Sequence, residues 1–262
     1  MTSSCRTCVV ICYWTGRSSK PLFKLLSAMQ SIRAGAPFDV VIVCNGGDAA
    51  PLEIPPRFST MSIRVINREN TGWNLGAWEA GWRASPGYEY FLFLQAECFI
   101  KTEGWLHRFE HRMDFDAGMG LLGERIMWNG MTWDYAKART ALDLSDQPEI
   151  LTNFESYRHN LRQKGIEPGA LGTHVVSIIL FTRRSILEDV DGFPLMGDTY
   201  VEAVSCEIGL SKNVENKGYR ISQLGDDAFC TIGHTQWTAL DHLKTTAFDY
   251  GRRIYRSVFP RT

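Results

Sequence analysis

The sequence predicts one α/β domain, with a mixed and mainly parallel sheet flanked by helices. Three observations predict it. Apolar strands alternate with amphipathic helices through the first half, an order that gives parallel strands joined by right-handed crossovers. The 262 residues are 44% apolar, which is enough for one large core. Residues 90–94 are apolar throughout, as in a strand that is buried on both faces.

Four strands and two helices are expected in the first half. Apolar runs rich in β-branched and aromatic residues predict strands over residues 7–13, 38–43, 62–66 and 90–94. A helix begins near Ser18 or Ser19, either of which can cap it, and ends near Gly35. Its apolar stripe is Leu22, Leu25, Leu26, Met29 and Ile32. A second, short helix presents Leu75, Trp78 and Trp82 on one face.

The second half is less regular but continues the same pattern. Helices are expected over residues 103–113, around 151–161, before the Asp191-Gly192 turn and from about Val201 to Gly218. Strands are expected over residues 119–122, 174–182 and 220–224, with His234 in a loop after the last of them. His174 begins one of these strands, and we expect a histidine there to be satisfied by hydrogen bonds.

Bulk properties narrow the function classes. The formal net charge of −1 gives no field that favours nucleic acid, so we expect no nucleic-acid partner. The sequence has seven cysteines, no charged and apolar leader at its start and no long apolar run. These features predict a reduced, cytoplasmic protein. The tail over 239–262 alternates aromatic and basic residues, a pattern compatible with a helix that touches a membrane surface.

Several polar residues stand where predicted strands end. Asn70-Thr71-Gly72 forms a turn before the second helix, and Gln95-Ala96-Glu97 follows the buried strand. Open α/β sheets bind their ligands at the carboxyl ends of the strands. We therefore expect the Asn70 turn and Glu97 to face one common site.

These motifs resemble the nucleotide-sugar-dependent glycosyltransferases of the GT-A fold, a Rossmann-like fold, and most of all the inverting family 2. Asn70, Gly72 and Gly81 match the family's N-x-G turn and small-residue helix, whereas Gln95-Ala96-Glu97 replaces its Asp-x-Asp metal motif. The Gly192-Phe193 turn, followed by Glu207 before Lys217-Gly218-Tyr219, resembles the surroundings of the family's catalytic acid. The resemblance covers about residues 9–234. It implies a GT-A domain over 1–238, with a donor half over 1–122, an acceptor half over 123–238 and a helical tail over 239–262.

The implied reaction moves a sugar from a nucleoside diphosphate to a saccharide hydroxyl in a single displacement, and such enzymes commonly build polysaccharides. Glu207 is the candidate base, a role that a carboxylate within hydrogen-bond reach of the hydroxyl performs. Glu202 is the competing candidate for that role. The acceptor is expected to contact Trp128 and Trp133, because indole faces stack well on sugars.

The donor-binding residues implied by the resemblance lie at strand ends and in the turns that follow them. They are Tyr13, Thr15, Arg17, Asn45, Asp48, Asn70, Gly72, Gln95 and Glu97. A divalent cation, Mg²⁺ or Mn²⁺, would bind Glu97 and His234 and act as a Lewis acid on the diphosphate. Because Gln95 lacks a negative charge, this site is expected to be weak, with Arg17 taking part of the diphosphate's charge. No other cofactor is expected.

Two alternatives remain open. The chain could be an inactive, GT-A-like subunit that binds a glycan or a nucleotide sugar. It could also be a nucleotidyltransferase, although residues 15–20 only faintly resemble the glycine-rich loop that such enzymes carry after the first strand.

Overall fold

A seven-stranded sheet forms the centre of the computed structural model, which describes residues 5–47, 51–143 and 148–236. Across the sheet the order is β10 (Arg220–Gln223), β6 (Met119–Gly123), β9 (Ile179–Arg183), β4 (Tyr90–Gln95), β1 (Thr7–Trp14), β2 (Phe38–Asn45) and β3 (Ile63–Arg68). Only β9 runs antiparallel to its neighbours. The sheet is therefore mixed and mainly parallel, as the sequence predicts.

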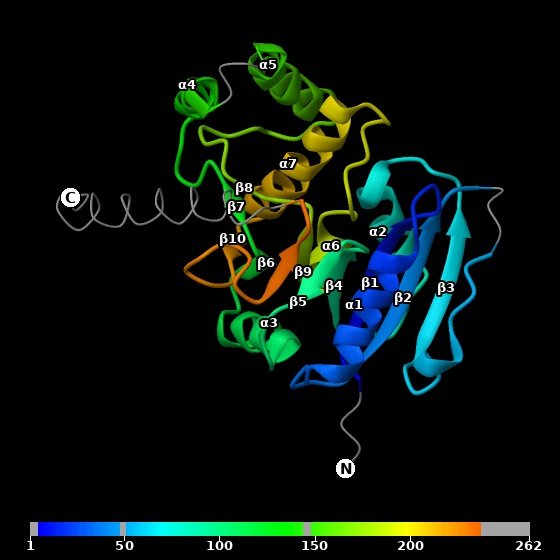
Figure 1. Ribbon diagram of the computed structural model, residues 1–262. Coiled ribbons are helices and arrows are strands. Elements are labelled where there is room, and N and C mark those ends of the chain that lie inside the picture. Colours follow the sequence, from blue (N-terminus) through cyan, green and yellow to red (C-terminus); the bar gives the residue numbers. More distant parts are fainter. Residues whose placement is uncertain (1–4, 48–50, 144–147, 237–262) are drawn as a thin grey trace.

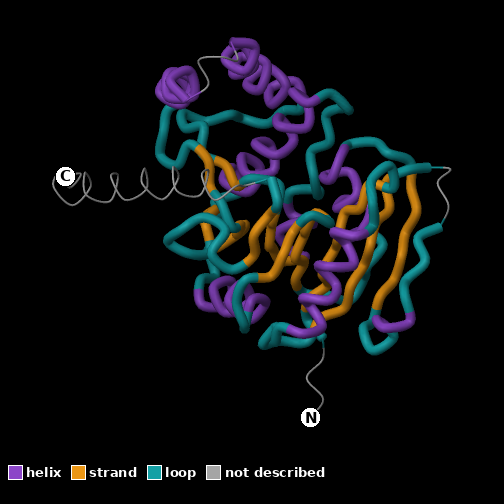
Figure 2. The backbone as a smooth tube through the Cα atoms, in the orientation of Figure 1, coloured by secondary structure: helices purple, strands orange, loops and turns teal. Residues whose placement is uncertain are grey.

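Helices cover both faces of this sheet (Figures 1 and 2). The described helices are α1 (Lys20–Ser31), α2 (Trp73–Arg83), α3 (Trp105–Phe115), α4 (Trp133–Asp143), α5 (Pro148–Gln163), α6 (Arg184–Asp189) and α7 (Tyr200–Asn216), with a short 3₁₀ helix at Pro56–Phe58. Of these, α4 and α5 pack beside α7 rather than on the sheet. Alternate residues of β1 enter different cores: Val9 and Ile11 pack with α1 and α3, whereas Val10 packs with α2, α6 and α7. This alternation is the side-chain period of a strand.

The expected helical stripes form these cores. Leu22, Leu25, Leu26 and Met29 of α1 are buried against one face of the sheet. Leu75, Trp78 and Trp82 of α2 are buried against the other face, as predicted. A third cluster joins α4 and α5 to Ile208 of α7, outside the sheet. Ser19 occupies the N-cap position of α1, but its side chain makes no capping hydrogen bond.

Several parts of the second half differ from the prediction, and helix α4 was not expected at all. The expected single strand over 174–182 is two strands, β8 (His174–Val175) and β9, separated by a turn at residues 176–178. His234 lies in a strand rather than a loop, because β11 (Ile232–His234) pairs antiparallel with β5 (Cys98–Ile100). A further short pair joins β7 (Ile126–Met127) to β8. These short strands form through pairing with distant segments, which local sequence patterns do not reveal.

Two predictions lie outside the described residues: the helical tail over 239–262 and the donor contact of Asp48. None of the described helices has both the length and the hydrophobicity that crossing a membrane requires.

Candidate active site

The candidate site lies at one edge of the sheet. The parallel strands β1, β2, β3 and β4 all end at this edge, and the antiparallel β9 begins there, because Leu94 of β4 pairs with Ile179 of β9. The turn at residues 176–178 therefore meets the loops that follow β1 to β4. We call this edge, with its loops, the site edge.

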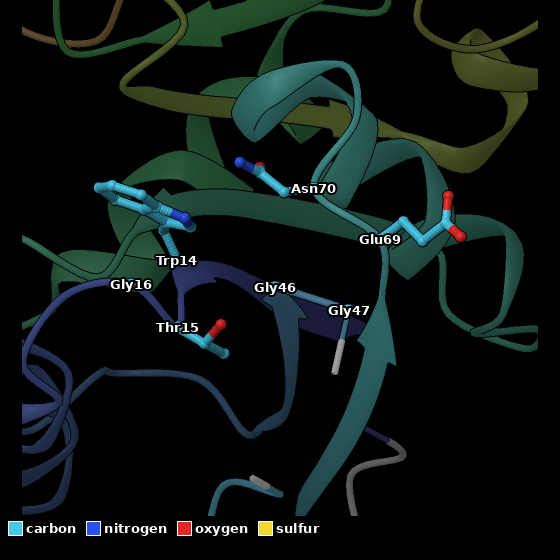
Figure 3. A pocket seen from close by; sticks show the side chains of 7 residues that line it. All are labelled: Trp14, Thr15, Gly16, Gly46, Gly47, Glu69 and Asn70. Carbon is cyan, nitrogen blue, oxygen red and sulfur yellow. The ribbon is translucent and has the colours of Figure 1, made fainter. Parts of the chain in front are cut away.

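A cavity of about 520 Å³ opens at the site edge between the loops that follow β1, β2 and β3. It is lined by Trp14, Thr15, Gly16, Gly46, Gly47, Glu69 and Asn70. Figure 3 shows the Asn70 side chain pointing toward Trp14, whereas the Glu69 side chain points away from both. Thr15 and Asn70 are thus at a cavity of the size that small-molecule sites have, roughly 300–1,000 Å³.

Trp14 is the aromatic residue among the lining residues that the sequence reasoning missed. Its side chain is exposed, and the guanidinium carbon of Arg17 lies 5.5 Å from the centre of its ring. The hydroxyl of Tyr13 donates to the carbonyl of Arg17 at 2.8 Å, which fixes the loop that carries both residues. Tyr13 is itself buried, so its role is to hold this loop in place. A tryptophan placed directly after a buried strand was the available signal.

Glu97 and Arg17 face each other at the same edge. The Arg17 Nη1 atom lies 3.4 Å from Glu97 Oε1, and the Glu97 side chain is 25% exposed. Arg17 reaches Glu97 from the loop after β1, whereas Glu97 follows β4. The structure thus brings together the expected metal ligand and the arginine that was expected to take part of the diphosphate's charge.

The Asn70 turn is fixed by a residue from the second half of the chain. Gly72 has the expected positive φ, +68°, and begins α2. Its N–H donates to Asp198 Oδ1 at 2.5 Å, and Trp73 Nε1 donates to the Asp198 carbonyl at 2.8 Å. Asp198, which the sequence reasoning missed, comes from the loop before α7. The Gly72 N–H is therefore already bonded to protein.

Asn45 supports the same turn from β2. Its Nδ2 atom donates to the Trp73 carbonyl at 2.8 Å, and its Oδ1 atom accepts from Arg68 Nη1 at 3.0 Å. The residue is 1% exposed. Its amide therefore positions the start of α2, with both polar ends already bonded to protein.

Glu207 lies at the middle of α7, and protein atoms contact both oxygens of its carboxylate. Oε2 accepts the backbone N–H of Ser177 at 2.5 Å, and Oε1 lies 3.2 Å from His174 Nε2. The Glu207 side chain is 14% exposed, whereas His174 is 3% exposed. The carboxylate is therefore the member of this group that solvent reaches. His174 is hydrogen-bonded as expected, through Nδ1 to the Gly172 carbonyl, and its other ring nitrogen faces the candidate base.

Ser177 connects Glu207 to the end of β4. Its carbonyl accepts from Gln95 Nε2 at 3.1 Å and from Asn74 Nδ2 at 2.5 Å. Hydrogen bonds therefore connect the candidate base, through Ser177, to Gln95. Gln95 is two residues from Glu97, so both candidate sites lie at the site edge. Glu202, the competing base, instead completes a capping box with Thr199 at the start of α7. Its hydrogen bonds with Thr199 hold the pKa of Glu202 below its ordinary value.

His234 is brought beside Glu97, as expected, by the pairing of β11 with β5. The Thr235 N–H donates to the Glu97 carbonyl at 3.3 Å. Burial lowers the pKa of His234, and the nearby Glu97 charge opposes this effect. The buried Glu124 fixes β11 by accepting the N–H groups of Thr231 and Ile232 at 3.2 and 2.9 Å.

Glu97 and His234 do not form a complete cation site by themselves. Within the described residues, no group of three or more His, Cys, Asp or Glu side chains could hold a metal ion. The Gln236 N–H donates to His234 Nδ1 at 3.2 Å, which places the proton of a neutral imidazole on Nε2. That Nε2 atom is buried without a partner among the described residues, and it carries a hydrogen rather than the lone pair that a metal needs. Glu97 is also paired with Arg17.

The two predicted acceptor tryptophans lie in the third core cluster. Trp133 is 5% exposed and donates from Nε1 to the Gly169 carbonyl at 3.1 Å. The Trp128 ring is half-buried and packs on Phe154 and His174, with centroid distances of 4.6 and 4.8 Å. Trp133 thus supports the fold, and Trp128 contacts the residue behind Glu207.

Comparison with solved structures finds a likeness to TarS of S. aureus. The structure of TarS 1–349 matches with a TM-score of 0.53 at 15% sequence identity, over 93% of this chain and 64% of that chain. Structures of the same TarS fragment with UDP-GlcNAc and with UDP match over 45% of this chain and 33% and 34% of those chains. Their TM-scores are 0.37 and 0.36, at 16% and 18% identity. No family model and no curated protein matches the chain. The chain spans less than two thirds of TarS 1–349, and the likeness confirms the predicted fold class, a mixed α/β domain of the GT-A type.

Proposed function

We propose that this chain is an inverting glycosyltransferase, akin to family 2, that moves a sugar from a nucleoside diphosphate to a saccharide hydroxyl. One observation carries the proposal. Through Ser177, the Glu207 carboxylate belongs to the same hydrogen-bonded edge as Gln95, which ends the strand before Glu97. A partly exposed carboxylate on this edge supports the proposal, because the base that activates the attacking hydroxyl must lie close to the donor.

The donor would occupy the site edge in two parts. Its nucleoside fits the cavity between Trp14 and Asn70, where the exposed indole offers a face for stacking. Its diphosphate lies toward Arg17, whose guanidinium can bind two phosphate oxygens. This placement makes 1–122 the donor half and 123–238, which carries Glu207, the acceptor half.

A divalent cation is proposed only as an ion that enters with the donor. Mg²⁺ commonly binds one or two protein carboxylates and completes its shell with substrate phosphates and water. Glu97 would be its protein ligand, released from Arg17 as the diphosphate arrives. When bound, such an ion would neutralise charge on the leaving diphosphate. His234 would lie next to it and, with hydrogen on Nε2, would donate to a phosphate oxygen.

The compartment proposed is the cytoplasm. All seven cysteines are free thiols, as expected of a protein in a reducing compartment. The acceptor, a glycan or another saccharide, would approach Glu207 from the α7 side of the site edge.

The first experiment is a donor screen. Nucleoside diphosphate sugars, beginning with the UDP-GlcNAc that TarS binds, are tested for thermal stabilisation of the protein with and without Mn²⁺. Release of nucleoside diphosphate is then measured with a panel of saccharide acceptors, and NMR of the product reports the anomeric configuration. We expect one donor to stabilise the protein and the product to be inverted.

Glu207→Gln tests the base directly. We expect transfer to fall by about 10²–10⁴-fold, the usual contribution of a general base, with donor binding retained. Glu202→Gln is the matched control, because it alters a carboxylate of the same helix that forms a cap, and it should keep turnover. Unchanged transfer in Glu207→Gln would reject the assignment. Donor binding without transfer in the unaltered protein would favour the inactive binding subunit, and pyrophosphate release from a nucleoside triphosphate would favour a nucleotidyltransferase.

A further inference from the structure

His174 and Glu207 form a nearly buried pair behind the site edge. His174 Nε2 lies 3.2 Å from Glu207 Oε1, and the two side chains are 3% and 14% exposed. The other ring nitrogen, Nδ1, lies 2.9 Å from the Gly172 carbonyl oxygen. The imidazole is thus fixed between a backbone oxygen and a carboxylate oxygen.

Counting hydrogens defines what this pair can do. A carbonyl oxygen only accepts, so the hydrogen between Nδ1 and Gly172 must belong to the ring. A neutral imidazole has no second hydrogen, and its Nε2 then turns a lone pair toward Oε1. An ionised carboxylate also only accepts. The 3.2 Å contact therefore becomes a hydrogen bond only when one additional proton lies between the two residues.

The groups around the pair do not take up that proton, so it stays on His174 or Glu207. Oε2 of Glu207 accepts the Ser177 N–H, and the edge of the His174 ring meets Trp128. Besides His174, the phenols of Tyr157 and Tyr200 are titratable groups close enough to feel the Glu207 charge. Burial, the neighbouring Tyr200 and the Glu207 charge raise the pKa of Tyr157 to about 12, and burial and the Glu207 charge raise the pKa of Tyr200. Both phenols stay neutral near pH 7.

We propose that His174 is a positioning residue that stabilises the proton which Glu207 removes from the acceptor hydroxyl. This inference rests on the proposed function. As the acceptor O–H bond breaks, its proton passes to the Glu207 carboxylate and is shared between Oε1 and Nε2. The freed oxygen electrons form the bond to the sugar's anomeric carbon, and the bond from that carbon to the phosphate oxygen breaks. Its electrons leave on the nucleoside diphosphate. His174 is too deeply buried to contact the substrate, so it acts through Glu207.

The test is the pH dependence of transfer in His174→Gln, with release of nucleoside diphosphate from the best donor of the panel as the readout. Glutamine cannot take up the shared proton. We expect kcat to fall about 10- to 100-fold, part of the contribution of a general base. We also expect the acidic limb of the pH–kcat profile to move to lower pH, because the carboxylate alone is protonated less readily. His174→Phe, which keeps a ring of similar size, should behave alike and replaces the glutamine variant if that one does not fold.

Ser211→Ala is the control for packing. The Ser211 hydroxyl accepts the N–H of Val175, the neighbour of His174, at 3.0 Å. Its loss loosens β8 without removing the imidazole, so the acidic limb should keep its position. If the acidic limb is unmoved in both His174 variants, or moves equally in Ser211→Ala, the inference is wrong.

A double variant separates this inference from the proposed function. Because the two residues act as one unit, adding His174→Gln to Glu207→Gln should cause no further loss. Independent, multiplying losses would overturn the inference. If Glu207→Gln alone keeps full transfer, the proposed function itself fails. If Glu207→Gln is inactive while the His174 variants keep the normal profile, only the role of His174 is refuted.

Discussion

Glu207 and Gln95 bond to the two backbone groups of a single residue, Ser177. Glu207 accepts its N–H at 2.5 Å, and Gln95 donates to its carbonyl at 3.1 Å. Gln95 stands where the glycosyltransferases that the sequence resembles carry the first acid of their metal motif. Here its amide bonds to the turn that orients the candidate base. A carboxylate at position 95 would present lone pairs to a carbonyl oxygen, so the amide suits this position and an acid does not.

Gln95→Glu should accordingly destabilise the protein rather than restore a metal motif. We expect the free energy of unfolding to fall by about 1–3 kcal/mol, because a part-buried carbonyl loses a donor and faces a charge. Urea unfolding measures this change. Gln30→Glu, at an exposed glutamine of α1, should stay within about 0.5 kcal/mol of the parent. Tighter Mn²⁺ binding without loss of stability in Gln95→Glu would contradict the prediction.

Trp14→Ala tests the cavity as the nucleoside site. Stacking of a base on an aromatic side chain contributes about 1–3 kcal/mol, so the Kd of the nucleoside diphosphate should rise about tenfold or more. Calorimetric titration provides the measurement. Phe115→Ala, at an aromatic residue that is 80% exposed at the end of α3, should leave the Kd unchanged. Equal affinities in Trp14→Ala and the parent would place the nucleoside elsewhere.

Arg17→Ala tests the diphosphate site. Hydrogen bonds to charged groups contribute about 1.5–3 kcal/mol, and we expect the Kd of a nucleoside diphosphate to rise at least about tenfold. The affinity for the nucleoside without phosphates should not change, which distinguishes charge recognition from disturbance of the Trp14 loop. Arg33→Ala, which removes an exposed ion pair with Glu103, is the control. An equal loss of nucleoside affinity in Arg17→Ala would reject the role.

Arg6→Met should make stability depend less on pH. Hydrogen bonds from Arg6 lower the pKa values of Glu89 and Asp114 in the folded state. Carboxylates with lowered pKa values stabilise the fold above their unfolded values, 4.5 and 3.8, and this contribution is lost as the pH falls through the folded values. The variant should lose about 1 kcal/mol at pH 7, since the network is partly exposed, and progressively less below pH 4. Urea unfolding across this range checks it, and a difference that stays constant with pH would refute it.

The position of the residues that follow the parallel strands was predictable from the sequence, because the carboxyl ends of parallel strands share one edge of a sheet. That rule places Thr15, Asn70 and Glu97 together without knowledge of any other contact. The turn at residues 176–178 was not predictable in the same way. The run from Val175 to Leu180 contains neither Gly nor Pro, and Ser177 is its only polar residue. The strand breaks there because Gln95, Asn74 and Glu207 bond to Ser177, and all three are distant in sequence.

The same limit explains the partners of the predicted residues. Asp198 fixes Gly72 across 126 positions of sequence, and His174 reaches Glu207 from a different element. Local patterns assigned His174 to a satisfied hydrogen bond, which it makes, but could not say with which side chain. Residue type and periodicity predict where a side chain stands on its element, whereas its partners depend on how the elements pack.

The order of strands in the sheet also bears on how the chain can be divided. Residues 1–122 include β1 to β4. The strand β9, which pairs with β4 in the sheet, comes from the second half. A fragment that stops at 122 would leave the aromatic strand β4 with unsatisfied backbone groups and a ready surface for self-association. We therefore expect such a fragment to precipitate, and the two halves of the chain not to fold independently.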